Sequence, residues 1–197
     1  FEIIFINDSG PEQGWNIIEN IQNAYPELIR AFRLKKNRGQ HLATFIGLKE
    51  AYGDYIFTID EDGQHNPQYM IPMKSALDES NFDLLYGKFF KTEQSFFRRI
   101  SSSLLRRILC LFIPDLPEEY SSYRLIRKTL VQRLDVNVDG TILLDAELGK
   151  TTKNYGSLLI KHSRRISGKS SYTISKLVNQ SLDTLFKYSS KFRIIFN

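Results

Sequence analysis

The sequence contains a single cysteine, Cys110, which lies in a short apolar run. One thiol cannot build a disulfide framework or a cysteine-based zinc or iron–sulfur site. We therefore expect the protein to belong to a reducing compartment, and Cys110 to be a small residue of the core. No apolar run approaches the roughly 18 residues that a membrane-spanning helix needs. With only 6 Pro and 11 Gly in 197 residues, collagen-like and low-complexity classes are also excluded.

Acidic residues are scarce in the second part of the chain. Residues 1–86 carry 7 Lys and Arg against 13 Asp and Glu, whereas residues 87–197 carry 20 against 9, so the two parts have net charges of −6 and +11. No acid occurs between Glu147 and Asp183, a stretch with seven Lys and Arg. This stretch suits a phosphate-bearing partner, and a solvated basic surface is the alternative.

Strand-like and helix-like segments alternate through the first part. This alternation predicts a single α/β domain with a mostly parallel central sheet and helices on both faces. The chain begins directly in a buried-strand pattern without an initiator Met, so we expect it to be a piece of a longer protein. The expected strands are 1–6, 28–34, 54–59 and 82–86, and the expected helices are 15–24, 40–51 and 67–77.

The pattern changes after Gly87. Residues 95–112 combine four arginines with a broad apolar face, which predicts an amphipathic helix that either packs on the sheet or lies at a membrane interface. Further strands are expected at 123–126 and 158–161, and further helices from 127, over 142–150 and over 174–188.

Three carboxylates follow the strand that ends at Ile59, in the sequence Asp60-Glu61-Asp62-Gly63-Gln64. Ligands of parallel sheets bind beyond the carboxyl ends of the strands. Asp60 and Asp62 can converge on one cation while Glu61 points elsewhere, and Mg²⁺ or Mn²⁺ held by two carboxylates commonly binds substrate phosphates as well. A solvated acidic turn is the alternative.

Two other strand ends carry polar residues. Asp8 follows the first strand and can accept a hydrogen bond from a base or a ribose, although turn and cap residues have the same composition. The basic segment 35–40 joins a strand to a helix, and the amides at that helix start favour an anion. His41 and His65 each follow a Gln; we interpret them as surface turn residues, with an approach to a ligand as the alternative, and His162 as a strand-end residue.

Five ordered blocks carry a resemblance over nearly the whole chain: INDSGPEQGWNII, LKKNRGQHLATFIGLKEAYGDYIFTIDEDGQHNP, DLLYGKF, SSYRLIRK and KHSRRISGKSSYTISKL. The sequence resembles the family 2 glycosyltransferases of GT-A fold, a Rossmann-like nucleotide-diphospho-sugar transferase fold. It is most similar to the branch with dolichyl-phosphate mannose synthase and the bacterial polyprenyl-phosphate glycosyltransferases. The strand that usually opens this family's domain is not in the sequence, and the usual Arg before the Asn-x-Gly block is Lys36.

The resemblance implies an inverting, metal-dependent hexosyltransferase that moves a sugar from a UDP- or GDP-sugar to a lipid phosphate at the cytoplasmic face of a membrane, in the assembly of cell-envelope glycans. It divides the chain into a nucleotide and metal half, 1–86, and an acceptor half, 87–197. The metal, Mg²⁺ or Mn²⁺, falls on Asp60 and Asp62. The implied catalytic residues are Asp62, Glu119 and Arg124; the donor-binding residues are Asp8, Lys36, Asp60, Gln64, Arg164 and Lys169; the acceptor-binding residues are Arg165, Ser170 and Tyr172.

Two alternative functions stay open at this point. The same fold and donor could serve a sugar hydroxyl acceptor, which needs a carboxylate base from among Glu118, Glu119, Asp145 and Glu147. A non-catalytic signalling domain that binds Mg²⁺ is the alternative from another class. A nucleic-acid partner is disfavoured because the basic residues follow no recognised binding module and the first part is acidic.

Overall fold

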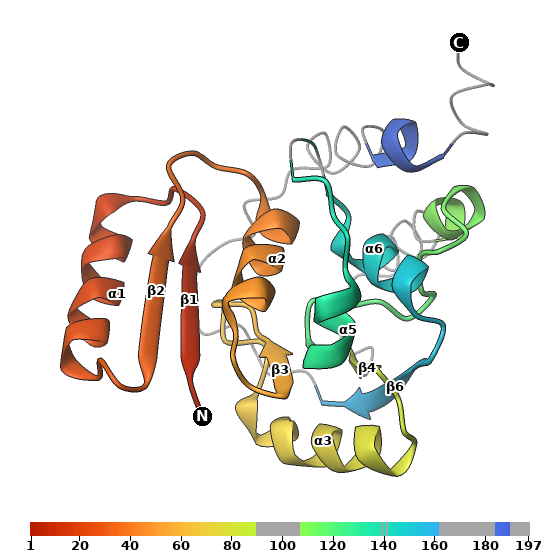
Figure 1. The fold of residues 1–197 in the computed structure, drawn as a ribbon, viewed down its shortest axis with the longest axis horizontal. Helices are drawn as coiled ribbons and strands as arrows, with labels where there is room; N and C mark the ends of the chain where they lie inside the picture. The colour runs from red at the N-terminus through yellow and green to blue at the C-terminus, as the bar shows by residue number, and fades with distance from the viewer. Residues whose placement is uncertain (90–106, 139, 141, 162–183, 190–197) are drawn as a thin grey trace.

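A computed structural model describes residues 1–89, 107–138, 140, 142–161 and 184–189 (Figure 1). Through residue 89 strands and helices alternate in the predicted order. The elements are β1 (Ile3–Asn7), α1 (Glu12–Ala24), β2 (Ile29–Arg33), α2 (Gln40–Glu50), β3 (Tyr55–Thr58), the 3₁₀ turn η1 (Pro67–Tyr69), α3 (Met70–Glu79), β4 (Leu84–Phe89), β5 (Arg124–Arg127), α5 (Lys128–Arg133), α6 (Leu144–Thr151) and β6 (Tyr155–Ile160).

The first two strands form a parallel pair, with Ile3 opposite Ile29 and Asn7 opposite Arg33. Helix α1 packs against β2 and α2 packs against β1. Helix α1 begins at Glu12 rather than at the predicted Trp15. An acid in the first turn interacts favourably with the helix dipole, which accounts for the earlier start.

The other four strands form a sheet in the order β3-β5-β4-β6. Strand β5 is antiparallel to both β3 and β4, whereas β6 is parallel to β4, so three of the four strands run in one direction. This confirms a mostly parallel arrangement. It differs from the prediction in that the described strands divide into two hydrogen-bonded sheets instead of one.

Side chains alternate between the two faces of the larger sheet. On one face Leu84, Tyr86 and Ile126 pack with residues of α2, α5 and α6. On the other face Leu85 and Leu125 pack with residues of α3. Successive side chains of a strand point to opposite faces, so a strand whose successive residues are all apolar needs helices on both faces of the sheet. The helices on the two faces provide this cover, as predicted (Figure 1).

Residues 107–112 are helical, which agrees with the end of the predicted amphipathic helix; its earlier part lies outside the described residues. Leu109 and Ile113 are buried against Leu143 and Ala146 at the start of α6, and Cys110 is half-buried beside them. Among the described residues, no helix combines the length and the hydrophobicity that crossing a bilayer requires.

Candidate functional site

Asp60 lies in the loop that follows β3 and is held by three parts of the chain. Its Oδ1 accepts a hydrogen bond from Gln40 Nε2 at 2.6 Å, and its Oδ2 accepts one from Ser122 Oγ at 2.5 Å. Its backbone N–H donates to Nδ1 of His65 at 2.9 Å. Gln40 is the first residue of α2 and Ser122 precedes β5, so the position of this carboxylate depends on the packing of both elements.

Asp62 shapes the turn that follows. Its Oδ1 accepts a hydrogen bond from the backbone N–H of Gln64 at 3.0 Å, and Gly63 between them has a φ of 75°. This is an Asx turn with a left-handed residue, a conformation that glycine adopts without steric cost. The structure describes the backbone role of Gln64, and its predicted contact with a donor stays a prediction.

The loop suits a hard cation that is only partly coordinated by protein. Among the described residues, no group of three or more His, Cys, Asp or Glu side chains is placed to hold a metal ion together. Two carboxylates are nevertheless enough for Mg²⁺, which usually keeps several waters and binds substrate phosphates. A carboxylate has about four lone-pair sites, and the hydrogen bonds from Gln40 and Ser122 to Asp60 use two of them.

A buried ion pair lies beneath this loop. Arg124 donates from Nε and Nη2 to the two carboxylate oxygens of Asp145, both at 2.7 Å, and the side chains are 3% and 1% exposed. The hydroxyl of Tyr86 donates to the same carboxylate at 3.1 Å. Nη1 of Arg124 lies 3.3 Å from the carbonyl oxygen of Ser122, which also accepts a hydrogen bond from Thr58 Oγ1 at 2.5 Å. Arg124 therefore supports the segment that holds Asp60.

Burial and charge shift the pKa values of these groups. Burial, and then the charge of Asp145, raise the pKa of the Tyr86 hydroxyl well above its usual value. Burial alone would lower the pKa of the Arg124 guanidinium, but the charge of Asp145 and its hydrogen bonds raise it above the usual value. Burial lowers the pKa of His41, on which the charges of Asp145, Arg124 and Asp60 also act. His41 is thus partly buried, contrary to its predicted surface position.

The carboxylate of Asp8 holds the basic loop that leads into α2 by hydrogen bonds. Its Oδ1 and Oδ2 accept hydrogen bonds from the backbone N–H groups of Arg38 and Gly39 at 2.7 and 2.8 Å. Gly39 has a φ of 87°, which favours glycine at this helix start. The turn role that we weighed for Asp8 is therefore present, and its predicted contact with a nucleotide base stays a prediction.

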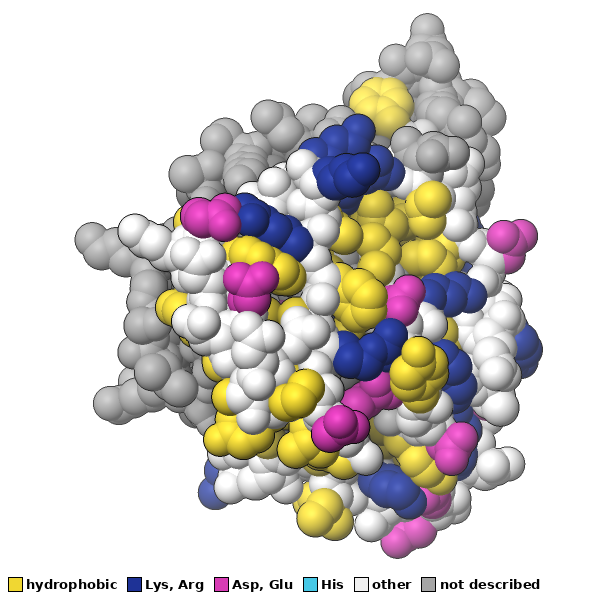
Figure 2. Space-filling model, turned by 60° about the vertical axis from the view of Figure 1, so that its left-hand side comes forward, with side chains coloured by type: hydrophobic (Ala, Val, Ile, Leu, Met, Phe, Trp, Pro, Cys, Tyr) yellow, Lys and Arg dark blue, Asp and Glu magenta, His cyan; other side chains and the backbone are white. Residues whose placement is uncertain are grey.

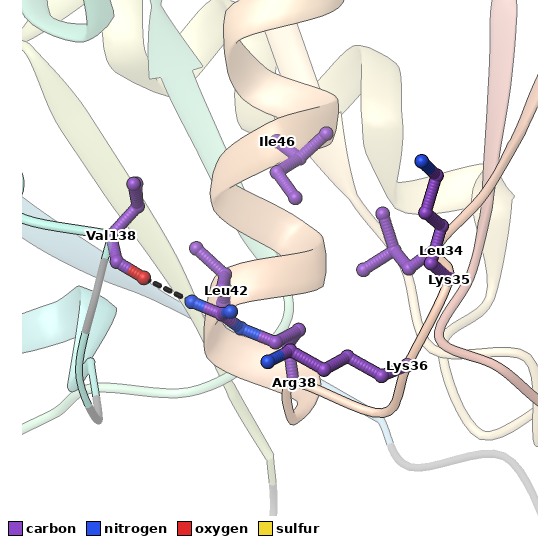
Figure 3. Close-up of a pocket in the computed structure, with 7 residues that line it drawn as sticks. All are labelled: Leu34, Lys35, Lys36, Arg38, Leu42, Ile46 and Val138. Atoms are coloured by element: carbon purple, nitrogen blue, oxygen red, sulfur yellow. Dashed lines mark hydrogen bonds between the residues drawn. The ribbon is translucent and has the colours of Figure 1, made fainter.

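A pocket of about 310 Å³ opens beside this loop. In Figure 3, Leu42 and Ile46 of α2 lie between Leu34 on one side and Val138 on the other. The remaining lining residues are cationic: Lys35, Lys36 and Arg38. Arg38 Nη2 donates to the carbonyl oxygen of Val138, which joins the two walls. Figure 2 shows a similar combination on the face it presents, with Lys and Arg side chains at the upper edge of exposed hydrophobic surface.

Glu119 occupies a polar cluster on the larger sheet. It pairs with Lys88 of β4 and accepts a hydrogen bond from Ser157 Oγ of β6. The Glu119 side chain is 41% exposed, so it remains accessible to solvent. Its catalytic role stays a prediction. The rival base Asp145 is buried against Arg124, and Glu147 is mostly buried beside Lys150.

Besides His41, the sequence reasoning misplaced His65, and it missed two other residues near Asp60. His65, predicted at the surface, is 6% exposed. Gln40 and Ser122 contact Asp60 directly but were not predicted, because neither spacing nor charge relates them to it. The predicted residues Arg164, Arg165, Lys169, Ser170 and Tyr172 lie outside the described part of the chain.

The sequence model for glycosyl transferase family 2 matches residues 1–142, which include the Asp60 loop, Ser122 and Arg124. The chain belongs to this family.

Among curated family relatives, an undecaprenyl-phosphate 4-deoxy-4-formamido-L-arabinose transferase from Pseudomonas fluorescens is 25% identical over 186 residues, which are 94% of this chain and 55% of the relative's own length. A dolichol-phosphate mannosyltransferase from Pyrococcus furiosus is 28% identical over 152 residues, 73% of this chain and 42% of its own length. The chain thus spans about half the length of these relatives.

Solved structures support the fold of the family 2 domain. Glucosyl-3-phosphoglycerate synthase from Mycobacterium tuberculosis, in complex with Mn²⁺, UDP and glucosyl-3-phosphoglycerate, matches with a TM-score of 0.62 and 15% identity, covering 95% of this chain and 68% of that one. S. aureus TarS 1-349 with UDP-GlcNAc matches with a TM-score of 0.57 and 16% identity, covering 94% and 56%. The predicted family and the GT-A fold are both confirmed.

Proposed function

We propose that this family 2 domain transfers a sugar from a UDP- or GDP-sugar to a polyprenyl phosphate, with inversion at the anomeric carbon. The observation that carries the proposal is the match over 94% of this chain to a relative named as an undecaprenyl-phosphate transferase. The held carboxylate of Asp60, with Asp62 two residues later, supports the donor half of the reaction. Residues 1–86 form the nucleotide and metal half of the proposed site, and 87–197 form the acceptor half.

The chemistry of the acceptor explains why a strong general base is unnecessary. A phosphate monoester is largely ionised at pH 7, since its second pKa is about 6. One of its oxygens attacks the anomeric carbon while the bond from that carbon to the diphosphate oxygen breaks, and the nucleoside diphosphate leaves. A bound Mg²⁺ or Mn²⁺ supplies charge that stabilises the departing diphosphate.

The chain's own residues bind and orient the substrates. Asp60 and Asp62 are the residues that would hold the cation, and the cations beside the pocket, Lys36 among them, place positive charge near the end of β2. Asp8 and Gln64 complete the proposed donor side with Arg164 and Lys169, and Arg165, Ser170 and Tyr172 are assigned to the acceptor. Glu119 is the carboxylate assigned to orient the acceptor, with Lys88 beside it.

Such an acceptor places the domain at a membrane surface, and we propose the cytoplasmic face. The excess of cations after residue 87 fits this location, because anionic headgroups attract clustered Lys and Arg.

Calorimetric titration with UDP and with GDP, in Mn²⁺ and then in EDTA, tests the donor half. We expect one nucleotide to bind in Mn²⁺ and to bind far more weakly in EDTA. Asp62→Asn should abolish transfer to a polyprenyl phosphate without unfolding the domain, since it removes a charge from the cation site and keeps the side-chain shape. No binding of either nucleotide would contradict the proposal and favour a signalling domain, whereas transfer to a sugar hydroxyl alone would contradict the acceptor.

A further inference from the structure

The imidazole of His65 is the most enclosed side chain of the loop that carries Asp60 and Asp62. It is 6% exposed and lies in a stack of three rings. Its centroid is 4.8 Å from that of Tyr123, with a 20° angle between the planes, and 5.4 Å from that of Phe89, with a 10° angle. Aromatic contacts of this kind restrict the plane of the ring. The ring is therefore fixed by β4 and by the residue that precedes β5.

The hydrogen bond to His65 determines which ring nitrogen carries the proton. Nδ1 accepts the backbone N–H of Asp60 at 2.9 Å, so Nδ1 is unprotonated and the proton of the neutral ring is on Nε2. Nε2 lies 3.8 Å from Oδ2 of Asp60. Nδ1 thus accepts a hydrogen bond from the backbone of Asp60, and Nε2 lies beyond hydrogen-bond distance of the carboxylate of the same residue.

The contacts of Asp60 divide between side chain and backbone. Gln40 and Ser122 fix the carboxylate oxygens, and His65 fixes the peptide N–H from which the side chain extends. The far end of the loop is held separately, because the Tyr123 hydroxyl donates to the carbonyl oxygen of Asn66 at 2.8 Å. Metal and catalytic sites need their ligands held within about 0.5 Å by packing and by hydrogen bonds from surrounding residues, and the bond from the Asp60 N–H to His65 adds to those made by the carboxylate.

We propose that His65 is a positioning residue that sets the backbone of Asp60, and thereby the carboxylate pair, for the divalent cation. The inference rests on the proposed function, because it concerns the cation that the donor brings. Loss of a partner that orients a metal ligand typically weakens metal binding about 10–100-fold. We expect an effect of that size when the Nδ1 acceptor is removed.

Two variants separate the acceptor from the ring. His65→Asn places an amide oxygen at the same distance along the side chain as Nδ1, so it keeps an acceptor for Asp60 and loses the stack. His65→Phe keeps the stack and loses the acceptor. Tyr123→Phe is the matched control, because it removes one hydrogen bond from the same loop without touching Asp60. Mn²⁺ affinity in the presence of the bound nucleotide, measured by electron paramagnetic resonance, is the readout.

We expect about 10-fold or greater weakening in His65→Phe, substantial rescue in His65→Asn and a change within about twofold in Tyr123→Phe. Nitrogen-15 NMR of the metal-free wild-type protein gives a second readout that needs no variant, and it should show the proton on Nε2. If His65→Phe binds Mn²⁺ as tightly as the wild-type protein, or if the wild-type ring carries its proton on Nδ1, the role proposed for His65 is wrong, and the proposed function is unaffected. A wild-type protein that binds neither nucleotide nor Mn²⁺ would overturn the proposed function and this inference together.

Discussion

Replacing Asp145 with Asn would remove the charge that balances a buried guanidinium. Arg124 is 3% exposed and makes two 2.7 Å hydrogen bonds to this carboxylate. Breaking a buried pair by removing one partner typically costs about 3–5 kcal/mol, because the remaining charge stays buried. The whole free energy of unfolding of a domain is only about 5–15 kcal/mol, so a large share of the stability is at risk.

The assay for Asp145→Asn is urea unfolding followed by circular dichroism. With a slope of about 2 kcal/mol per molar urea, the loss corresponds to a midpoint lower by about 1.5–2.5 M. The triple variant Tyr86→Phe, Arg124→Met, Asp145→Leu removes the whole polar cluster, and replacement of buried ion pairs by apolar residues is often neutral. We expect it to recover most of the lost stability.

The same triple variant separates stability from function. It lacks the Arg124 contact to the Ser122 carbonyl, and Ser122 holds Asp60, so we expect Mn²⁺ binding to remain weakened in a stable protein. A midpoint change below about 0.5 M in Asp145→Asn would refute the reasoning, since it would mean that the guanidinium finds water or another partner at little cost.

Two further predictions concern packing and pH. Gly149→Ala in α6 should lower the free energy of unfolding by about 1–3 kcal/mol, because an added Cβ would lie 1.8 Å from the carbonyl oxygen of Asp115. Gly14→Ala in α1 is the control, since its Cβ would meet nothing within 4 Å; in the same urea assay it should be neutral or stabilising by up to about 1 kcal/mol. Burial lowers the pKa of His41 from 6.5, so the unfolded chain binds more protons there, and stability present above pH 6.5 should be lost as pH falls toward the folded pKa. His41→Gln should flatten that decline in thermal melts from pH 7.5 to 5, and parallel curves for the two proteins would contradict the assignment.

Local sequence patterns predicted the elements of the first part well. Alternating apolar residues and the turns that separate them defined β1 to β4 and α1 to α3 within a few residues, because these elements depend on neighbours in the chain. The antiparallel direction of β5 and its place between β3 and β4 were not predicted. Strand order depends on pairing between distant segments, and hydrophobic periodicity reports only the local secondary structure of each segment.

The candidate site shows the same division between local and distant information. Asp60 and Asp62 were predicted as cation ligands because they follow a buried strand, and sheets bind ligands at such ends; this role stays a prediction. Gln40 lies 20 residues before Asp60 and Ser122 lies 62 residues after it, so no local pattern connects them. His65 looked exposed because its chain neighbours are polar, whereas its burial comes from Phe89 and Tyr123.

An Asp-x-Asp sequence by itself is therefore a weak indicator of a metal site, and the reason is physical. Two carboxylates in a flexible turn repel each other and are solvated; they become a preorganised site only when other groups hold them before the cation arrives. For Asp60 the holding groups come from α2, from the segment before β5 and from the loop itself. The segment before β5 is supported in turn by Arg124. This dependence explains why the ordered blocks across the whole chain indicated the family more specifically than the acidic motif did.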